Sequence, residues 1–288
     1  MQQNTTSSHP LLGGRAAVLA TMHRKEAAIA PVLASGLGLQ VLLPPADFDS
    51  DRFGTFTREA PRPGDQLQTA RAKARAGMTA TGLAVGIASE GSFGPHPGLP
   101  FVPANREIVV LIDDEHHLEV AGEAFSTQTN FAAGAVCSLP EALAFAQRAG
   151  FPEHGLVVGT GRPEDTLLKG VVDPQQLEEA VAFALARSGR VHLETDMRAL
   201  YNPTRMGVIA QAARHLVEKL YQFCPRCGHP GYGIIALRRG LPCALCGTPT
   251  DLPRAAVHGC SRCARQEIVP RPDGLRAADP AQCPLCNP

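Results

Sequence analysis

Eight cysteines arranged as four Cys-x-x-Cys pairs constrain the fold of this chain more than any other feature of its sequence. The pairs are Cys224/Cys227, Cys243/Cys246, Cys260/Cys263 and Cys283/Cys286. Fifteen residues separate the first pair from the second, and nineteen separate the third from the fourth. Both gaps lie within the ~15–20 residues typical of four-cysteine zinc sites. Sequential pairing is therefore the simplest assignment, although a cross-braced arrangement also agrees with the spacing.

Four thiolate sulfurs favour zinc and complete its tetrahedral shell, which leaves no open position for a substrate water. The alternatives, disulfide pairs or a redox-active Cys-x-x-Cys, agree less well with four regularly spaced pairs. We therefore predict a double four-cysteine zinc-ribbon module over residues 222–288, with two structural zinc ions. The ninth cysteine, Cys137, lies in an apolar segment and is predicted to be a buried thiol.

The charge of this module argues against binding to nucleic acid. From residue 224 onward the sequence has eight arginines, no lysine and four acidic residues, an excess of four positive charges. Two zinc-tetrathiolate sites, each with a charge of about −2, would cancel that excess. Because no basic footprint remains, a rigid structural cap or a surface that docks a partner protein is favoured over a nucleic-acid interface.

The bulk properties of the 288-residue chain indicate a globular protein without a preferred charged partner. Its 27 basic and 27 acidic residues balance, and its longest apolar runs, such as Ile108–Ile112, are too short to span a bilayer. Residues 1–13 begin with a polar stretch that lacks the features of a secretory signal, so they are predicted to be a disordered tail. Cysteines suited to a reducing compartment complete the prediction of a cytoplasmic location without membrane association.

Strand-like and helix-like segments interleave over residues 14–221, which predicts an α/β domain. Strands are expected at residues 15–20, 39–43, 82–88, 107–112, 155–158, 167–172 and 190–194. Helices are expected at residues 25–35, 65–77, 138–149, 173–187 and from 202 onward. Asp65 with Gln68 is a variant of the capping box, and Ser138 and Asp173 are predicted to begin the next two helices. Gly77 is the expected C-cap of the second helix. The boundary with the cysteine-rich module is expected at residues 220–223.

Polar residues gather after the first and the third expected strands. Thr21 and Lys25 lie in a strand-to-helix turn that could hold an anion, although a solvated helix start explains them equally well. The second group consists of Ser89, Glu90, Gly91, Ser92 and His96. Its glycine would let a ligand approach the backbone, and Glu90 could bind magnesium or activate water. An ordinary turn would explain the glycines but not the whole polar run.

Two further polar segments precede and open the last expected helix. Asp196 could hold a metal ion and Arg198 could bind phosphate, although a charged turn would also explain this pair. At the helix start, Asn202, Thr204 and Arg205 could bind phosphate together. Asn202 could equally be an ordinary N-cap.

Two other charged groups have plainer interpretations. Of Arg71, Lys73 and Arg75, which lie on one expected helix, two are predicted to be solvated. The acidic and histidine-rich run 113–117 directly follows a strand and is predicted to be a charged hairpin turn rather than a metal site.

The order of these parts resembles the inosine/xanthosine triphosphatase superfamily, a group of house-cleaning nucleotide pyrophosphatases. The resemblance extends over residues 14–221 and rests on short motifs. These are Ala20–Lys25 after the first strand, Ala70–Ala74 on an alanine-rich helix, Gly86–Gly91 at an acidic glycine segment, and Asn202–Arg205 at the start of a long helix. The whole chain, including the cysteine tail, also resembles an uncharacterised bacterial family of unknown function.

The superfamily resemblance implies a mixed central sheet with flanking helices and a magnesium-dependent hydrolysis of a nucleotide phosphoanhydride. Glu90 would hold the magnesium ion, with Asp196 as a second acid, and Lys25, Lys73 and Arg205 would bind phosphates. A metal-activated water would attack while the metal and the cations neutralise the developing charge. The alternative is a non-enzymatic domain that binds a small anion and whose zinc ribbons dock a partner protein.

Overall fold

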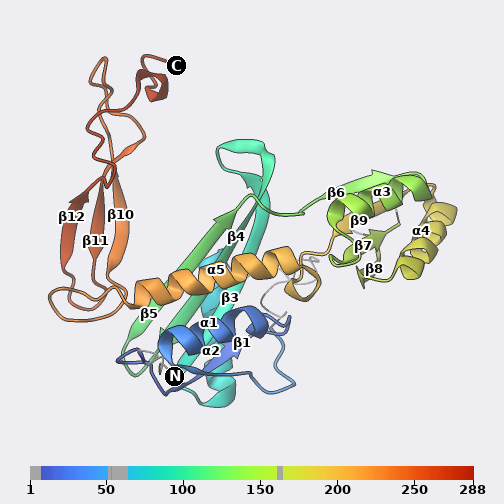
Figure 1. Cartoon of the computed structure of the whole chain (residues 1–288), viewed down its shortest axis with the longest axis horizontal. Coiled ribbons are helices and arrows are strands. Elements are labelled where there is room, and N and C mark those ends of the chain that lie inside the picture. The colour runs from blue at the N-terminus through green and yellow to red at the C-terminus, as the bar shows by residue number, and fades with distance from the viewer. Residues whose placement is uncertain (1–7, 51–52, 54–63, 161–164) are drawn as a thin grey trace, which may run out of the picture. The chain divides into compact units, whose positions relative to one another are not determined.

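The computed structural model of the chain describes residues 8–50, 53, 64–160 and 165–288 (Figure 1). The chain divides into two compact units, residues 1–217 and 218–288, named here the α/β unit and the cysteine-rich unit. Among the described residues, none of the helices combines the length and the hydropathy that a bilayer span requires.

The α/β unit contains a five-stranded sheet in the order β2-β1-β3-β4-β5. Its strands are β1 (Ala16–Ala20), β2 (Gln40–Leu42), β3 (Val85–His96), β4 (Leu99–Asp113) and β5 (Leu118–Ser126). The first three strands run parallel, whereas β4 and β5 are each antiparallel to the preceding strand. The sheet is therefore mixed, which confirms the predicted α/β class.

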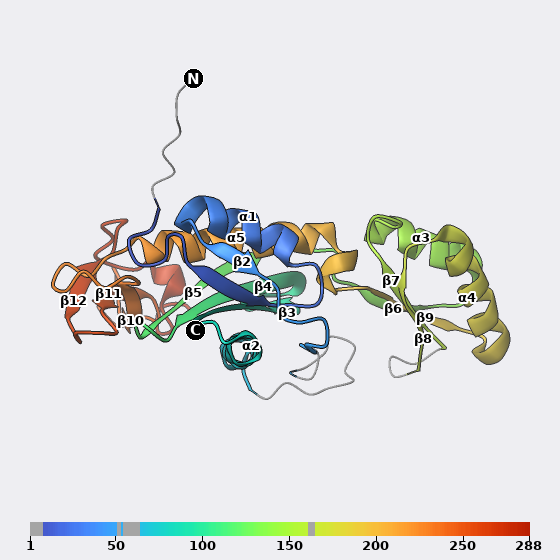
Figure 2. The ribbon, with the colours of Figure 1, turned by 90° about the horizontal axis from the view of Figure 1, so that it is seen from below.

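Helices cover both faces of this sheet. Helices α1 (Glu26–Leu37) and α5 (Pro203–Leu220) lie on one side, and α2 (Gln66–Thr81) lies on the other (Figure 2). Ala88 of β3 and Val110 of β4 belong to the apolar cluster under α2. Because successive strand residues face opposite sides, each strand supplies apolar side chains to both layers.

Helix α2 begins at a capping box, as the sequence predicts. Asp65 Oδ1 accepts from the amide of Gln68 at 2.8 Å, and Gln68 Oε1 accepts from the amide of Asp65 at 3.0 Å. The helix passes Gly77, the expected C-cap, and ends with Gly82 in the left-handed conformation. Gly77 serves close packing instead, because a Cβ there would lie 3.0 Å from that of Ala20.

The polar segment 89–96 is a strand rather than the expected loop. It forms the second part of β3 and pairs with β4 in an antiparallel ladder that extends to His96. Alternation explains its polar composition, because Ser89 lies on one face of the sheet and Glu90 on the other. The run 113–117 is a turn between β4 and β5, as predicted.

The α/β unit also contains a four-stranded sheet in the order β6-β9-β7-β8, whose neighbouring strands are all antiparallel. Its strands are β6 (Ala133–Val136), β7 (Leu156–Gly159), β8 (Thr166–Val171) and β9 (Val191–Thr195). Helices α3 (Leu139–Ala149) and α4 (Pro174–Ser188) complete an apolar core around Leu193. Both helices begin at their predicted N-caps, Ser138 and Asp173.

Two short segments differ from their sequence-based descriptions. Residues 8–13 belong to the folded unit rather than to a tail, because Leu12 is fully buried and the amide of His9 donates to Leu37 O at 3.1 Å. Residues 1–7 lie outside the described residues. Cys137 is exposed, which contradicts the predicted buried thiol, because Val136 takes the inward position at the end of β6.

The cysteine-rich unit is built on a three-stranded antiparallel sheet in the order β10-β11-β12. Its strands are β10 (Gly233–Arg239), β11 (Pro253–Gly259) and β12 (Gln266–Pro270), and Figure 1 shows them side by side. Each strand lies between two consecutive cysteine pairs, so the chain reverses direction at the second and third pairs. The described residues also include the 3-10 turns Ala199–Tyr201 before α5 and Pro280–Gln282 near the last cysteine pair.

Candidate functional site

The loop after β1 brings Lys25 to the carboxyl end of the parallel strands. From β1 the chain passes through α1 to β2 on one side, whereas β3 lies on the other side of β1. Open α/β sheets bind ligands outside the carboxyl ends of their strands at such a switch in strand order. Arg24, immediately before Lys25, has a φ of 56°, a left-handed conformation that is uncommon for a residue with a long side chain.

Lys25 is a buried cation whose donors are only partly used. It is 5% exposed, and its Nζ donates to the backbone oxygen of Ser89 at 3.2 Å. An ammonium group has three donors, and Lys25 forms no ion pair with a carboxylate of the described chain. Burial, reinforced by the positive charge of Arg205, lowers the pKa of Lys25 to about 7.

Among the described residues, four other buried charges act most strongly on Lys25, and with it they form the group named here the Lys25 cluster. They are Lys73, Glu90, Glu107 and Arg205. When Lys25 is protonated, the cluster therefore contains three cations and two carboxylates, a net charge of +1. A buried excess of positive charge favours the approach of an anion, because that anion would relieve the repulsion among the cations.

Two buried hydroxyl groups near Lys25 have no hydrogen-bond partner in the described structure, Thr21 Oγ1 and Ser89 Oγ. They are close in space because Ala20 and Ala88 are paired in the parallel register of β1 and β3. Buried polar atoms are normally hydrogen-bonded. Unpartnered hydroxyls beside a partly satisfied lysine therefore indicate a place for a ligand or an ordered water.

Glu90 and Lys73 form the part of the cluster that lies between β3 and α2. Lys73 Nζ lies 2.8 Å from Glu90 Oε2, and both side chains are buried. Gln66, in the first turn of α2, donates to the backbone oxygens of Glu90 and Arg106, each at 2.7 Å. Gln66 thus anchors α2 to two strands at the position of the carboxylate.

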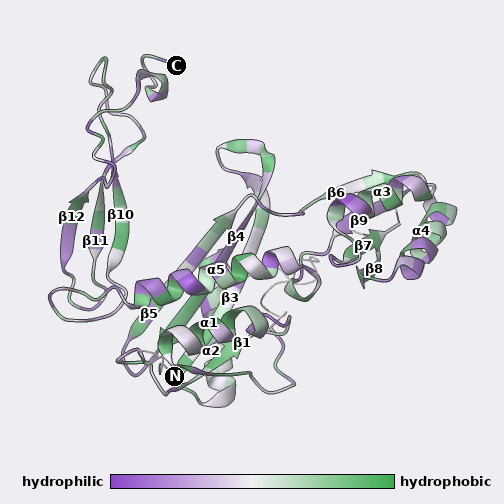
Figure 3. Cartoon of the chain, in the orientation of Figure 1, coloured by the Kyte–Doolittle hydropathy of each residue, from purple (hydrophilic) through white to green (hydrophobic). Residues whose placement is uncertain are grey.

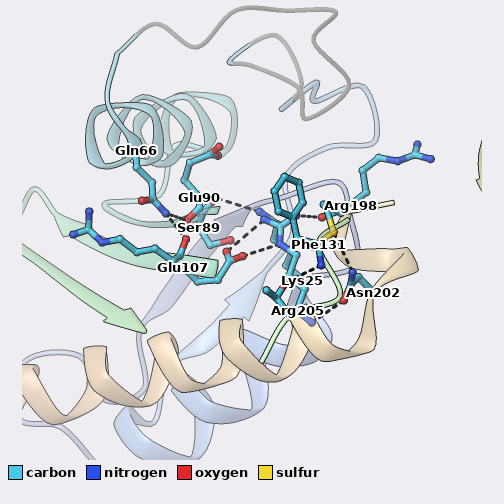
Figure 4. Close-up of polar contacts among 12 residues, drawn as sticks. Lys25, Gln66, Ser89, Glu90, Glu107, Phe131, Arg198, Asn202 and Arg205 are labelled. Carbon is cyan, nitrogen blue, oxygen red and sulfur yellow. Dashed lines mark hydrogen bonds and ion pairs between the residues drawn. The ribbon is translucent and has the colours of Figure 1, made fainter. Parts of the chain in front are cut away.

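Arg205, from the first turn of α5, forms the other part of the cluster (Figure 4). Its Nε donates to Glu107 Oε1 at 2.7 Å, and another N–H donates to Met197 O. Gly91 makes room for this pair, because a Cβ there would lie 2.4 Å from both Arg205 and Glu107. Asn202 caps the helix by accepting from the amide of Arg205 at 2.9 Å. Arg205 is thus fixed by protein groups and contributes mainly its charge.

Three of the proposed site residues form their own contacts outside the Lys25 cluster. Asp196 is ion-paired with Arg198 at 2.7 Å. Thr204 Oγ1 lies 2.9 Å from His154 Nε2. The connection between β9 and α5 therefore supports Arg205 through Asn202 and Met197, while its acid and its hydroxyl are engaged elsewhere.

Residues farther along β3 and on the outer side of α2 also lie apart from the cluster. Ser92 follows Gly91 toward the β3–β4 hairpin, and His96 lies at the end of the strand, where its Nδ1 accepts from the amide of Gly98. Arg71 and Arg75 form ion pairs at the surface. This confirms that two of the three basic residues on α2 are solvated and that Lys73 is the exception.

Sequence reasoning missed Glu107, which is the carboxylate partner of Arg205. A usable signal was present in the strand that contains it. Glu107, Val109 and Leu111 share one face of β4, so a charged residue was aligned with two apolar positions that are fully buried. A charge at an inward strand position requires a buried partner.

The eight paired cysteines form two compact clusters. One contains Cys224, Cys227, Cys260 and Cys263, and the other contains Cys243, Cys246, Cys283 and Cys286. Sulfur–sulfur distances within them are 3.7 Å for Cys224–Cys263 and 3.6 Å for Cys246–Cys283. A tetrahedral ion with metal–sulfur bonds of about 2.3 Å requires sulfurs about 3.8 Å apart, whereas a disulfide requires about 2.05 Å. The geometry therefore fits two sites that could each bind zinc.

The pairing of the cysteines is interleaved, which corrects the sequential assignment. The first pair joins the third and the second joins the fourth. The sheet explains this arrangement. Because each strand carries the chain from one end of the sheet to the other, odd-numbered pairs meet at one end and even-numbered pairs at the other.

A third group of potential metal ligands lies in the turn between β4 and β5 and consists of Asp113, Glu115 and His116. Arg15 donates to Asp113 and also binds Glu115 at 2.6 Å. The guanidinium therefore supplies the positive charge that these acids need. This ion-pair network agrees with the predicted charged turn.

A comparison with protein families gives one match, to a family described as "Domain of unknown function (DUF6671)", over residues 73–288. The chain belongs to the DUF6671 family. The matched DUF6671 region begins at Lys73 and includes Glu90, Glu107, Arg205 and all eight paired cysteines, whereas Lys25 precedes it. Searches of curated proteins and of solved structures find no match to the chain.

Proposed function

We propose that the α/β unit binds a phosphate-bearing ligand at the Lys25 cluster and hydrolyses a nucleotide or related phosphoanhydride with magnesium. The observation that carries the proposal is Lys25 itself. Its ammonium group is buried at the switch in strand order with donors to spare, beside the unpartnered hydroxyls of Thr21 and Ser89. Phosphate oxygens would accept from all three groups.

The resemblance to the inosine/xanthosine triphosphatase superfamily assigns the same region to the same chemistry, which supports the proposal. Lys25 and Thr21 belong to the motif after the first strand, and Glu90 belongs to the acidic glycine motif. Lys73 would add charge from α2, and Arg205 would add it from α5. The two helices thus place cations on both faces of the sheet around the ligand.

Glu90 is the group that would hold magnesium. Magnesium in phosphoryl-transfer sites commonly takes one or two carboxylates and completes its octahedron with waters and substrate phosphates. One buried carboxylate beside a phosphate site therefore suffices. The bound ion would supply charge neutralisation and an activated water. Lys25, Lys73 and the two hydroxyls would orient the phosphates.

The test is hydrolysis of a nucleotide panel by the full chain in the presence of magnesium, with phosphate and pyrophosphate release measured. We expect release by the native protein and a loss of at least about 100-fold in Glu90→Gln, because the substitution removes the metal-binding charge while preserving shape. Glu119→Gln is the matched control, since the side chain of Glu119 forms a surface ion pair with Arg71. The absence of release, or release that Glu90→Gln leaves intact, would rule out the hydrolase.

A non-catalytic anion-binding domain, whose cysteine-rich unit docks a partner protein, is the second candidate. The ion pair between Lys73 and Glu90 favours it, because a carboxylate already neutralised by lysine binds a metal ion less readily. Calorimetry with magnesium pyrophosphate separates the two functions. If the chain binds magnesium pyrophosphate, Lys25→Met abolishes that binding and no nucleotide is hydrolysed, the α/β unit is a non-catalytic anion-binding domain.

A further inference from the structure

A pocket of about 440 Å³ lies in the cysteine-rich unit, at the end of the sheet that carries the even-numbered cysteine pairs. It lies where β11 begins and β12 ends. Its lining includes Leu241, Arg254, Pro270, Arg271, Leu275 and Arg276. A volume of this size is within the range of about 300–1,000 Å³ found for ligand pockets.

Three guanidinium groups line this pocket, and two of them lack a protein partner. Arg271 is held by Asp273, with Nε 2.9 Å from Oδ1, and it donates to Pro253 O at 2.6 Å. Arg254 and Arg276 are exposed and make no hydrogen bond or ion pair within the described ranges. The pocket therefore has local positive charge that is not paired with an acidic side chain of the described residues.

The remaining lining is apolar and includes Leu241, Pro270 and Leu275, the last of which is 52% exposed. Exposed apolar residues also occur on the edge strand β10, which Figure 3 shows in the green of hydrophobic residues along most of its length, and Arg238, Arg239 and Gly240 separate them from Leu241 in the sequence. Ile234 and Leu237 of this strand are more than half exposed. A ligand that complements the pocket would therefore carry carboxylates that bind the arginines and an apolar side chain that contacts the apolar lining.

We propose that this arginine pocket binds an acidic peptide segment in which an apolar side chain lies between carboxylates. Guanidinium groups bind carboxylates in a planar two-point geometry, and the apolar walls would exclude water from those contacts. A nucleic-acid strand fits less well. The pocket lining has no aromatic side chain for base stacking, and the charge of the whole unit is balanced once metal is bound.

The experiment measures binding of a short fluorescein-labelled peptide of alternating glutamate and leucine to the full zinc-loaded chain by fluorescence anisotropy. We expect micromolar binding that weakens by at least about tenfold in the double variant Arg254→Glu/Arg276→Glu, because each reversal replaces an attraction by a repulsion. Arg254→Lys should weaken it less, since charge is kept while the planar fork is lost. Arg262→Glu, an exposed arginine at the other end of the sheet, is the matched control.

Zinc content measured on every variant separates lost binding from lost folding. Unchanged zinc with lost binding in the double variant supports the pocket. Three results would overturn the proposal: no binding to the native chain, equal weakening by Arg262→Glu, or displacement of the peptide by oligothymidylate of the same charge. The outcome does not depend on hydrolysis at the Lys25 cluster, because the labelled peptide carries no phosphoanhydride.

Discussion

At the scale of single residues, the charge state of Lys25 is the property most directly open to experiment. Its pKa in the folded protein is lowered to about 7 by burial and by Arg205, from an ordinary value of 10.5. The unfolded chain therefore binds more protons than the folded one between these values, so this lysine makes the protein more stable as the pH rises from 7 toward 10.5. Anion binding follows the opposite course, because it needs the protonated form.

We therefore predict that sulfate, whose charge is constant in this range, binds more weakly as the pH rises from about 6 to about 9, by about tenfold overall. Isothermal calorimetry at constant ionic strength measures the effect. Lys25→Met should bind sulfate weakly at every pH, with no slope. Affinity that increases with pH in the native protein would contradict the role of Lys25.

The buried pair of Arg205 and Glu107 gives a prediction of stability. Arg205→Met should lower the free energy of unfolding by about 3–5 kcal/mol, because Glu107 would stay buried without its partner. The control is Arg106→Met, on the same strand as Glu107. Arg106 binds Glu123 at the surface, so its loss should cost less than about 1 kcal/mol. Urea denaturation of the full chain measures both free energies of unfolding. Equal decreases in the two variants would refute the prediction.

At the scale of elements, the contact between β5 and α5 depends on Gly122. A Cβ at this position would lie 2.2 Å from the backbone nitrogen of Leu216, so Gly122→Ala requires the helix to move. We predict a loss of about 2–3 kcal/mol in the free energy of unfolding. Gly207→Ala provides the matched control. Gly207 lies in α5, the helix that Gly122 contacts, and it has open space around it. Its replacement by alanine should raise the free energy of unfolding by about 0.5–1 kcal/mol. Thermal unfolding that shifts both variants in the same direction would contradict this packing.

Local signals in the sequence predicted most elements whose ends are set by caps. Asp65, Ser138 and Asp173 each mark a helix start in the structure, because a side chain satisfies free amides through local geometry. The extension of β3 beyond Ala88 was not predictable in this way. Its polar residues resemble a loop until β4 is placed beside them, and that pairing is a tertiary contact.

The same distinction applies to the candidate site. Lys25, Lys73, Glu90 and Arg205 were identified from short motifs, and the structure brings all four together. Asp196 was grouped with them because it also follows a strand, but that strand belongs to the other sheet. Strand order decides which strand ends meet, and sequence spacing does not specify strand order.

At the scale of the whole molecule, the interleaved cysteine clusters predict which residues share an ion. Cys227→Ser/Cys263→Ser should leave one zinc ion per chain at native affinity, because both substitutions fall in one cluster. Cys227→Ser/Cys246→Ser should leave none, because each cluster then has three sulfurs. Zinc retained against a competing chelator, quantified by emission spectrometry, measures both variants. The reverse pattern would indicate sequential pairing.

The alternation of strands and cysteine pairs also determines when this unit can fold during synthesis. If the cysteine pairs were joined sequentially, the first zinc site could form before the second had been synthesised. In the interleaved arrangement the first cluster must wait for Cys263, and the second must wait for Cys286. Until both cysteines have been synthesised, the earlier cysteines are unliganded thiols that a metal, an oxidant or a chaperone can reach. Maturation of the cysteine-rich unit should therefore depend on the supply of zinc after Cys286 has left the ribosome rather than earlier in elongation.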